Sequence, residues 1–238
     1  MVRRDQTDFA AARSILEESI RLGRELGDPW HLGYSFHWSA LVALREGDYE
    51  TAERECKASL KMRLRAGHTH GAAYSRLVLG LIALNQGDLG RAKPLFQRSE
   101  AMFRELEDKG GLSQTLQNMA YVALFEGNVA RAQSLIQEAL ALAREAGPRW
   151  LPPLCLARLA GVLAAEGQIE PAVRLWAAAE ALIASVGSYM DTADRLYYGR
   201  IIQPATSSLS EAALEAARLE GRAMLLEQAI QYALSLIH

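Results

Sequence analysis

The sequence is poor in residues that favour β-strands and in net charge. Valine, isoleucine and threonine together number 24 of 238 residues, whereas alanine and leucine number 40 and 36, so a protein built on sheets is disfavoured. The formal net charge is −2, from 26 basic and 28 acidic side chains. This balance excludes a strongly basic nucleic-acid-binding protein and an acidic disordered tail, and it fits a soluble globular protein.

Cysteine and long apolar runs are also scarce. Cys56 and Cys155 form neither a CxxC pair nor a disulfide framework, which favours a reducing compartment. No apolar run reaches the roughly 18 residues that a membrane span needs. The first residues, Met1 to Asp5, lack the apolar segment of a signal peptide. We therefore expect a cytoplasmic protein that does not contact the membrane.

What the sequence does contain is a repeat of 40 residues. Glycines recur at Gly47, Gly87, Gly127 and Gly167. A polar residue follows each of them, and four residues later comes an alanine: Ala52, Ala92, Ala132 and Ala172. A second glycine series lies half a period out of phase, at Gly27, Gly67, Gly147 and Gly187, and it lapses once, at Glu107. Glycine can end a helix in the left-handed conformation and Asp or Asn can cap the next, so the period predicts tandem helix pairs.

The repeat sets the expected domain organisation. A half repeat over 8–27 precedes four repeats over 30–67, 70–109, 112–147 and 150–187. Residues 1–187 thus form one array, in which the first full repeat has an A helix over 30–46 and a B helix over 49–66. Residues 188–238 are expected to form an atypical helical cap of the same domain, because a terminal repeat must cover the end of the stack.

Packing between helices should depend on alternating small and bulky residues. Small residues on the A helices allow close approach: Ala40, Gly80, Ala120 and Ala160. Small residues also recur on the B helices, at Ser59, Ser99, Ala139 and Ala179. Bulky apolar residues would fill the space between repeats: Leu16, Cys56, Phe96, Ile136 and Trp176. One helix pair cannot bury its apolar face alone, whereas a stack can.

Prolines and the C-terminal segment complicate this pattern. Pro94 should delay or kink its B helix, whereas Pro152 and Pro153 fall in a first turn, where proline is tolerated. Residues 189–202 could form one more A helix. Ser208 with Glu211 suggests a capping box for a helix over 209–220 that Gly221 ends, and 223–236 should form the last helix.

The run Gly80…Gly87-Asp88…Ala92…Phe96…Ser99 resembles the tetratricopeptide repeat, and the resemblance extends over residues 8–187. It implies an all-α fold, a right-handed superhelical array of antiparallel helix pairs. It also implies a non-catalytic scaffold that binds proteins on a concave groove lined by the A helices.

Two C-terminal runs resemble a narrower group. Ala172 to Leu182 and Leu219 to Ile230 are similar to segments near the end of bacterial LuxR-type transcriptional regulators and related signal-transduction ATPases. The resemblance implies the sensor or regulatory region of such a signal-transduction protein. The phosphate loop GxxxxGK[ST] is absent, so the chain resembles the repeat region alone.

Catalytic and metal motifs are missing from the sequence. It contains no phosphate loop, no GxSxG and no HExxH. His68-Thr69-His70 fits a surface turn better than a metal site, because two histidines at i and i+2 of a helix diverge. Cys56 occupies a core position. We therefore expect no enzyme activity, no cofactor and no metal.

The resemblance places a partner-binding groove on the A helices. Its candidate residues combine aromatic and amide side chains, which suit an extended peptide or a helix. They are Tyr34, His37, Tyr74, Leu77, Asn85, Gln114, Gln117, Asn118, Tyr121, Phe125 and Arg158. The positions Trp38, Leu41, Val78, Leu81 and Leu154 belong to the same face, and we expect Trp38 and Leu81 to be core residues.

The charges argue against two classes of ligand. The Lys, Arg and Asn residues with which chaperone-binding members of the family hold a carboxylate are mostly replaced here. Basic residues cluster on one B helix, at Arg54, Lys57, Lys61, Arg63 and Arg65, and we expect them to form a solvated convex face. Direct nucleic-acid binding is not expected.

A protein or peptide partner in the groove is thus the first functional hypothesis. Sensing of a small-molecule effector is one alternative. Self-assembly is another, because the half repeat over 8–27 lacks its own A helix. Leu16, Ile20 and Leu22 could then pair with a second copy as a homodimer.

Overall fold

The computed structural model describes residues 9–187 and 198–237, and every regular element in these two ranges is helical. The chain divides into two compact units, residues 1–106 and 107–238, which we call unit 1 and unit 2 and describe separately. None of the helices in the two described ranges is long and apolar enough to span a membrane.

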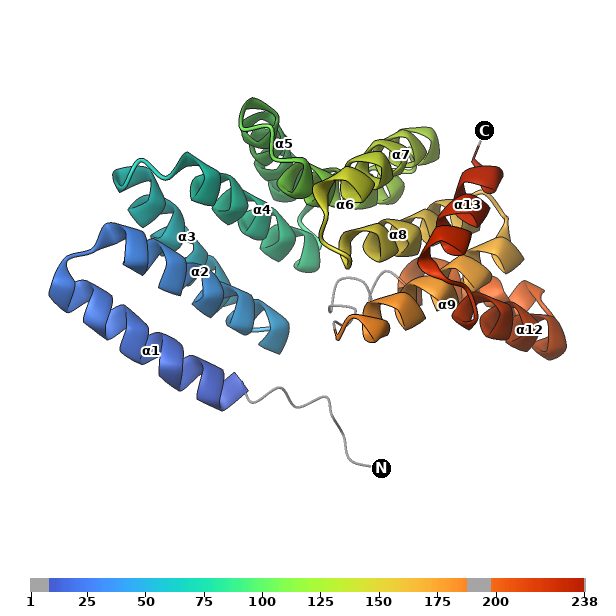
Figure 1. The fold of residues 1–238 in the computed structure, drawn as a ribbon, viewed down its shortest axis with the longest axis horizontal. Helices are drawn as coiled ribbons and strands as arrows, with labels where there is room; N and C mark the ends of the chain where they lie inside the picture. Colours follow the sequence, from blue (N-terminus) through green and yellow to red (C-terminus); the bar gives the residue numbers. More distant parts are fainter. Residues whose placement is uncertain (1–8, 188–197, 238) are drawn as a thin grey trace. The chain divides into compact units, whose positions relative to one another are not determined.

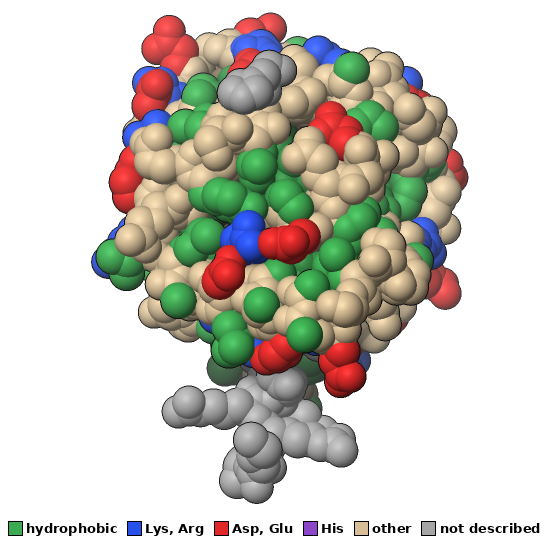
Figure 2. Space-filling view, turned by 90° about the vertical axis from the view of Figure 1, so that its right-hand side faces the viewer, with side chains coloured by type: hydrophobic (Ala, Val, Ile, Leu, Met, Phe, Trp, Pro, Cys, Tyr) green, Lys and Arg blue, Asp and Glu red, His purple; other side chains and the backbone are tan. Residues whose placement is uncertain are grey.

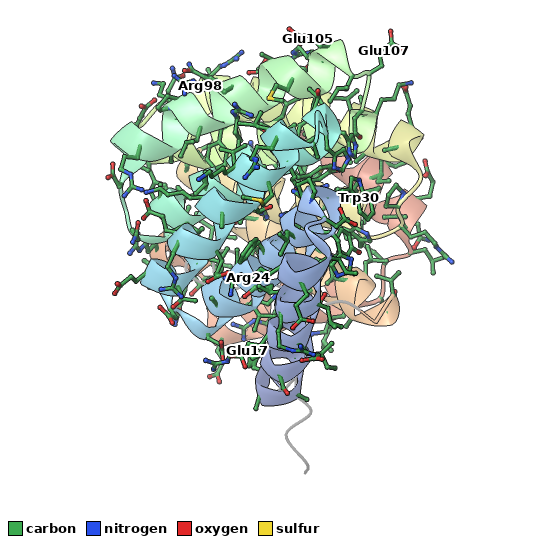
Figure 3. All side chains as sticks on the ribbon, turned by 90° about the vertical axis from the view of Figure 1, so that its left-hand side faces the viewer. Glu17, Arg24, Trp30, Arg98, Glu105 and Glu107 are labelled. Atoms are coloured by element: carbon green, nitrogen blue, oxygen red, sulfur yellow. The ribbon has the colours of Figure 1, made fainter. Side chains whose placement is uncertain are left out.

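Unit 1 consists of five helices, each packed against the next (Figure 1). They are α1 (Phe9–Leu26), α2 (Pro29–Glu46), α3 (Tyr49–Arg65), α4 (Thr69–Asn85) and α5 (Leu89–Glu105). Figure 3 views this unit from the side of α1, with Glu17 and Arg24 on α1 and Trp30 in the first turn of α2. The bounds of α2 and α3 lie within one residue of the A and B helices expected for the first repeat.

The predicted caps and turns define these helices. The Asp48 and Asp88 side chains accept hydrogen bonds from the backbone N–H groups of Thr51 and Arg91 at 3.0 and 2.9 Å, as N-cap residues do. All eight glycines of the two series have positive φ. Glu107, at the lapse in the second series, has the same left-handed conformation with φ 54°, so the turn geometry persists where the glycine is missing.

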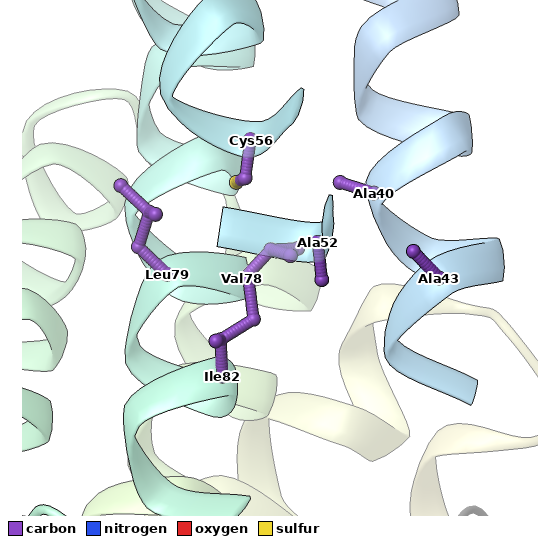
Figure 4. Close-up of a cluster of buried hydrophobic side chains, with 7 residues drawn as sticks. All are labelled: Ala40, Ala43, Ala52, Cys56, Val78, Leu79 and Ile82. Atoms are coloured by element: carbon purple, nitrogen blue, oxygen red, sulfur yellow. The ribbon is translucent and has the colours of Figure 1, made fainter. Parts of the chain in front are cut away.

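The core of unit 1 shows the predicted alternation of small and bulky residues. Ala40, Ala52 and Cys56 are fully buried and pack with Val78 and Ile82 of α4 in one cluster (Figure 4). The short side chains let α2, α3 and α4 approach one another, because bulk at these positions would hold the backbones apart.

Buried hydroxyl groups link the B helices α3 and α5 to the A helices of unit 1. Ser59 of α3 donates a hydrogen bond to the Gly33 carbonyl of α2 at 2.7 Å, and its Oγ lies 3.1 Å from the Ser75 Oγ of α4. Ser99 of α5 donates to the Ala73 carbonyl of α4 at 3.1 Å, which repeats the first bond one period later. These serines therefore supply polar links as well as small volume.

Proline positions differ in their effect on the helices. Helix α5 begins at Leu89 with Pro94 inside it, so of the two effects expected of Pro94, a late start or a kink, the late start is wrong. Proline lacks only one backbone donor, and the Asp88 cap still fixes the first turn of this helix. Pro152 and Pro153 occupy the first turn of the helix that begins at Leu151, as predicted.

Unit 2 begins with two helix pairs and ends in shorter elements. Its helices are α6 (Lys109–Phe125), α7 (Val129–Ala146), α8 (Leu151–Ala165), α9 (Ile169–Ser185), η1 (Tyr198–Ile202), α11 (Gln203–Ala205), η2 (Thr206–Ser208), α12 (Glu211–Arg222) and α13 (Leu226–Leu236). Helix α12 packs on α9, and α13 packs on α8 and α9. The helix expected over 189–202 lies largely outside the described residues, and residues 198–202 form a π-helix.

Two expectations for the C-terminal segment are wrong. Ser210, not Ser208, caps α12, because its Oγ accepts a hydrogen bond from the Ala213 N–H at 3.2 Å. Gly221 does not end that helix but lies within it, buried against the Arg174 carbonyl of α9, so a side chain at 221 would collide with the α9 backbone. A glycine without positive φ here serves close helix packing rather than a turn.

Helix α9 is held to the last two helices by one arginine. The Arg174 guanidinium donates to the Tyr232 hydroxyl of α13 at 2.9 Å and forms an ion pair with Glu220 of α12 at 2.7 Å. On the face shown in Figure 2, which carries α12 and α13, hydrophobic side chains are exposed between acidic and basic ones. The large apolar residues exposed on and between these helices are Leu219, Leu225 and Leu234.

Candidate partner-binding surface

The most exposed aromatic side chains of unit 1 lie on one face of α2. Trp30, Tyr34 and Trp38 are spaced four residues apart and are 54%, 50% and 43% exposed, so they follow one face of the helix. The Trp30 and Tyr34 rings stack at a centroid distance of 6.1 Å, and Tyr34 meets Trp38 edge to face at 6.0 Å. Three contiguous exposed rings are unusual on a protein surface without a binding role.

The row of rings continues onto the next helix pair. Trp30 stacks on His68 at 6.1 Å, and His68 stacks on His70 at 6.2 Å. His70 contacts Tyr74 at 5.1 Å, and Tyr74 packs edge to face on Phe103 of α5 at 4.8 Å. Phe103 is fully buried, so the rings that reach the surface, which we call together the aromatic surface, are Trp30, Tyr34, Trp38, His68, His70 and Tyr74.

A buried guanidinium lies beneath the aromatic surface. Arg63 of α3 is only 4% exposed. Its Nη1 donates to the Gly71 carbonyl at 2.7 Å and to the Ser75 Oγ at 3.0 Å, both on α4, and it lies 3.3 Å from the His37 Nδ1 on α2. The charge is therefore held between the two helices that carry most of the exposed rings.

Two glycines make the space that Arg63 occupies. A Cβ at Gly33 would lie 2.8 Å from the Arg63 Cγ, and a Cβ at Gly71 would lie 2.8 Å from its Nε and 2.7 Å from the His68 Nδ1. The expectation that Arg63 belongs to a solvated convex face is thus wrong, although Arg54, Lys61 and Arg65 on the same helix are exposed. Position 63 faces the neighbouring A helices. The equivalent position of the next repeat holds Phe103.

The histidines near this charge have lowered basicity. Burial and then the Arg63 charge lower the pKa of His37 to about 3, so its ring is neutral at pH 7 and can accept from Arg63. Burial, Arg63 and His70 also lower the pKa of His68. At neutral pH the guanidinium is therefore the positive charge under these rings.

The predicted groove residues of unit 1 fall into two groups. Tyr34 is exposed, and Tyr74 and Asn85 are half-buried, whereas His37 and Leu77 are buried. The Asn85 Nδ2 donates to the Leu81 carbonyl of its own helix at 2.8 Å. Trp38 was expected in the core, and its 43% exposure contradicts this, because Trp38 lies on the α2 face outside the contact with α3.

The predicted residues of unit 2 are mostly inside the protein. Gln117, Asn118, Tyr121 and Arg158 are 1%, 5%, 2% and 4% exposed. The Arg158 guanidinium lies 4.4 Å from the centroid of the Tyr121 ring, a cation–π contact between α8 and α6. Among the other candidates of unit 2, Phe125 is exposed, and Gln114 and Leu154 are half-buried.

Sequence reasoning missed three members of the aromatic surface: Trp30, His68 and His70. Trp30 lies one helical turn before Tyr34, so a search for aromatic residues at intervals of four would have found it. Arg63 could have been recognised as a buried residue from its place in the period. The equivalent positions in the later repeats, at 40-residue intervals, hold the apolar residues Phe103, Ala143 and Ile183. Gly33 and Gly71 gave no such signal, since only the fold brings them to one arginine.

The described residues hold no group of three or more metal-ligating side chains. Burial raises the pKa values of Cys56 and Cys155 to about 12, so neither thiol forms a thiolate at neutral pH.

Comparisons with known proteins agree with this architecture. Residues 33–105, which span most of α2 to α5, match the tetratricopeptide repeat family. A crystal structure of BtubC (BKLC) from P. vanneervenii is similar with a TM-score of 0.61 and 20% sequence identity, over 80% of this chain and 79% of that one. None of the curated proteins compared with the chain matches it. The predicted class, an all-α helical-repeat solenoid, is confirmed.

Proposed function

We propose that this chain is a non-catalytic protein-interaction module that binds an extended peptide segment of a partner on the aromatic surface. The observation that carries the proposal is the row of three exposed rings on α2, Trp30, Tyr34 and Trp38. The match of residues 33–105 to tetratricopeptide repeats, which generally mediate protein–protein interaction, supports it.

The physical basis is the contact area that these rings offer. Tryptophan and tyrosine bury large apolar areas when a partner covers them, and each loses little side-chain entropy on binding. Ring contacts hold Tyr34 between Trp30 and Trp38, so the surface is already ordered before binding. Pre-ordered aromatic residues of this kind commonly dominate binding free energies.

The test is a double substitution in the exposed row. A peptide selected from a random display library on the full chain is titrated calorimetrically against the wild type and Trp30→Ala/Tyr34→Ala. We expect at least about a hundredfold weaker binding by the variant, since two aromatic anchors are lost. Leu64→Ala is a matched control, because Leu64 is 53% exposed on α3 outside this surface. Unchanged affinity of the double variant, with wild-type helicity, would refute the assignment.

We also propose that the module belongs to a bacterial transcriptional regulator of the LuxR type. The support is the resemblance of the runs from Ala172 to Leu182 and from Leu219 to Ile230 to such regulators. The coding sequence that surrounds this chain should then encode a nucleotide-binding domain and a DNA-binding domain. A surrounding gene without either would disprove this context while leaving the binding proposal intact.

Homodimerisation through α1 is a second candidate, favoured by an exposed apolar stripe. Ile15, Leu22 and Leu26 are 69%, 42% and 78% exposed. Ile20, by contrast, is buried against Leu32 and Phe36 of α2, so it takes no part in such a contact. Light scattering over a hundredfold concentration range should show a dimer that Ile15→Ser/Leu26→Ser dissociates, and a monomer throughout would eliminate this candidate.

A further inference from the structure

The Arg63 charge has no acidic partner in the described part of the chain. Its hydrogen bonds go to a backbone carbonyl, a hydroxyl and a neutral imidazole, all through Nη1. Its Nε is buried and makes no hydrogen bond. An unneutralised guanidinium that is 4% exposed is costly, because neutral dipoles replace only part of its hydration.

The surroundings of Arg63 are neutral and aromatic. Tyr34 and His68 lie close enough to interact electrostatically with the guanidinium. Both side chains belong to the aromatic surface and neither is an acid. The salt bridges of α3 that the structure shows, Arg54 with Glu55 and Glu53 with both Lys57 and Arg91, involve other residues of that helix. Arg63 thus gives the aromatic surface a positive potential that the protein itself does not neutralise.

We propose that the aromatic surface selects a peptide carrying a carboxylate next to an aromatic or apolar side chain, with the carboxylate placed to interact with Arg63 between α2 and α4. This inference rests on the proposed function and specifies its partner. The rings of Trp30 and Tyr34 hold the apolar part, and the guanidinium supplies the attraction for the anion. A desolvated pair of this kind binds more strongly than an exposed one.

The experiment compares three hexapeptides with acetylated N-termini and amidated C-termini. Phenylalanine alternates with aspartate in the first, with asparagine in the second and with lysine in the third. Each is titrated calorimetrically against the full chain at pH 7. We expect the aspartate peptide to bind about tenfold or more tightly than the asparagine peptide, as a charge-assisted interaction predicts. The lysine peptide should bind most weakly.

Variants assign the preference to Arg63. Arg63→Met removes the charge at similar volume and should abolish the preference for aspartate over asparagine. Arg54→Met, at an arginine whose side chain is 62% exposed on the same helix, should retain it. His68→Glu offers a second route should Arg63→Met unfold, because position 68 lies beside the guanidinium. An internal carboxylate there should also abolish the preference. Both His68→Glu and His68→Gln lose the ring that stacks on Trp30, so the difference in preference between these two variants isolates the added charge.

The outcomes separate this inference from the proposed function. Equal binding of the aspartate and asparagine peptides by the wild type would overturn the anion preference and leave the aromatic surface as a peptide site. A preference that survives both Arg63→Met and His68→Glu would overturn the role of Arg63. If none of the three peptides binds, this inference fails, whereas the peptide-binding function is decided separately by the display-selected peptide and the Trp30→Ala/Tyr34→Ala variant.

Discussion

The ring of Phe96 on α5 lies directly against the backbone of Gly80 on α4. A Cβ at position 80 would be 2.5 Å from the ring Cε1, closer than packed carbon atoms come. Phe96 occupies the bulky B-helix position of its repeat, and the A-helix residue that faces it is glycine, so the ring has room against the α4 backbone. One period later, the same two positions hold Ala120 and Ile136, and both are buried.

Gly80→Ala should destabilise the protein by about 1–3 kcal/mol, the usual cost of overpacking a core. Adding Phe96→Ile should restore part of this loss, because the double variant reproduces the Ala120 and Ile136 combination. Urea unfolding of both single variants and the double variant gives the coupling free energy. Strictly additive effects would show that the two positions do not share one volume.

Glu107→Gly should stabilise the protein by about 1 kcal/mol. Glu107 has φ 54°, and a residue with a Cβ is strained in this conformation, whereas glycine is not. Thermal and urea unfolding would measure the gain. Glu107→Ala is the matched control, since it removes the carboxylate but keeps the Cβ. A similar gain in stability for both variants would show that removal of the carboxylate charge, rather than relief of backbone strain, causes the effect.

The stability of the protein should fall as the pH drops below about 6.5, in part because of His37. Its pKa is about 3 when folded and near 6.5 in an unfolded chain. The unfolded state therefore binds the extra proton between these values. Each pH unit then costs about 1.4 kcal/mol, or about 2 kcal/mol between pH 6.5 and 5.

Urea unfolding of the wild type and His37→Gln at several pH values would measure this contribution. The variant should lose less stability than the wild type over the same range, because glutamine does not titrate. Parallel curves for the two proteins would mean that the pKa of His37 is the same in the folded and unfolded states, contrary to its burial beside Arg63.

Neither cysteine should react with a thiol reagent while the protein is folded. Cys56 and Cys155 are fully buried, and burial raises both pKa values to about 12. With 5,5′-dithiobis(2-nitrobenzoate) at pH 8, we expect no release of thiolate from the native protein and two equivalents after denaturation in guanidinium. Rapid labelling of one thiol in the native state would show local opening around its helix.

Local signals in the sequence were sufficient for most helix boundaries. The glycine and Asp or Asn at each turn act within a few residues, so Asp48 and Asp88 cap the helices that they were expected to cap. Two errors remained, one in a local choice between neighbouring serines and one where a distant contact decides. Ser208 was chosen as the cap of α12 instead of Ser210, and Gly221 was expected to end α12, although it packs against the backbone of α9.

The candidate surface was only partly predictable, for a similar reason. Tyr34 and Tyr74 belong to it as expected, and the spacing of A-helix residues is enough to place them on one face. Whether a residue on that face is exposed depends on its neighbours. Trp38 is 43% exposed, and Gln117 is 1% exposed, although both were assigned to the same face of their helices.

The sequence by itself determined the all-α class, the 40-residue period and the turns, because these depend on residue types at short spacing. Only the tertiary structure decided where the charge of Arg63 lies. That position required Gly33 of α2 and Gly71 of α4 to meet one side chain of α3, and no local rule couples residues so far apart. The burial of a charge depends on the packing of three helices, so it emerges only when they are assembled.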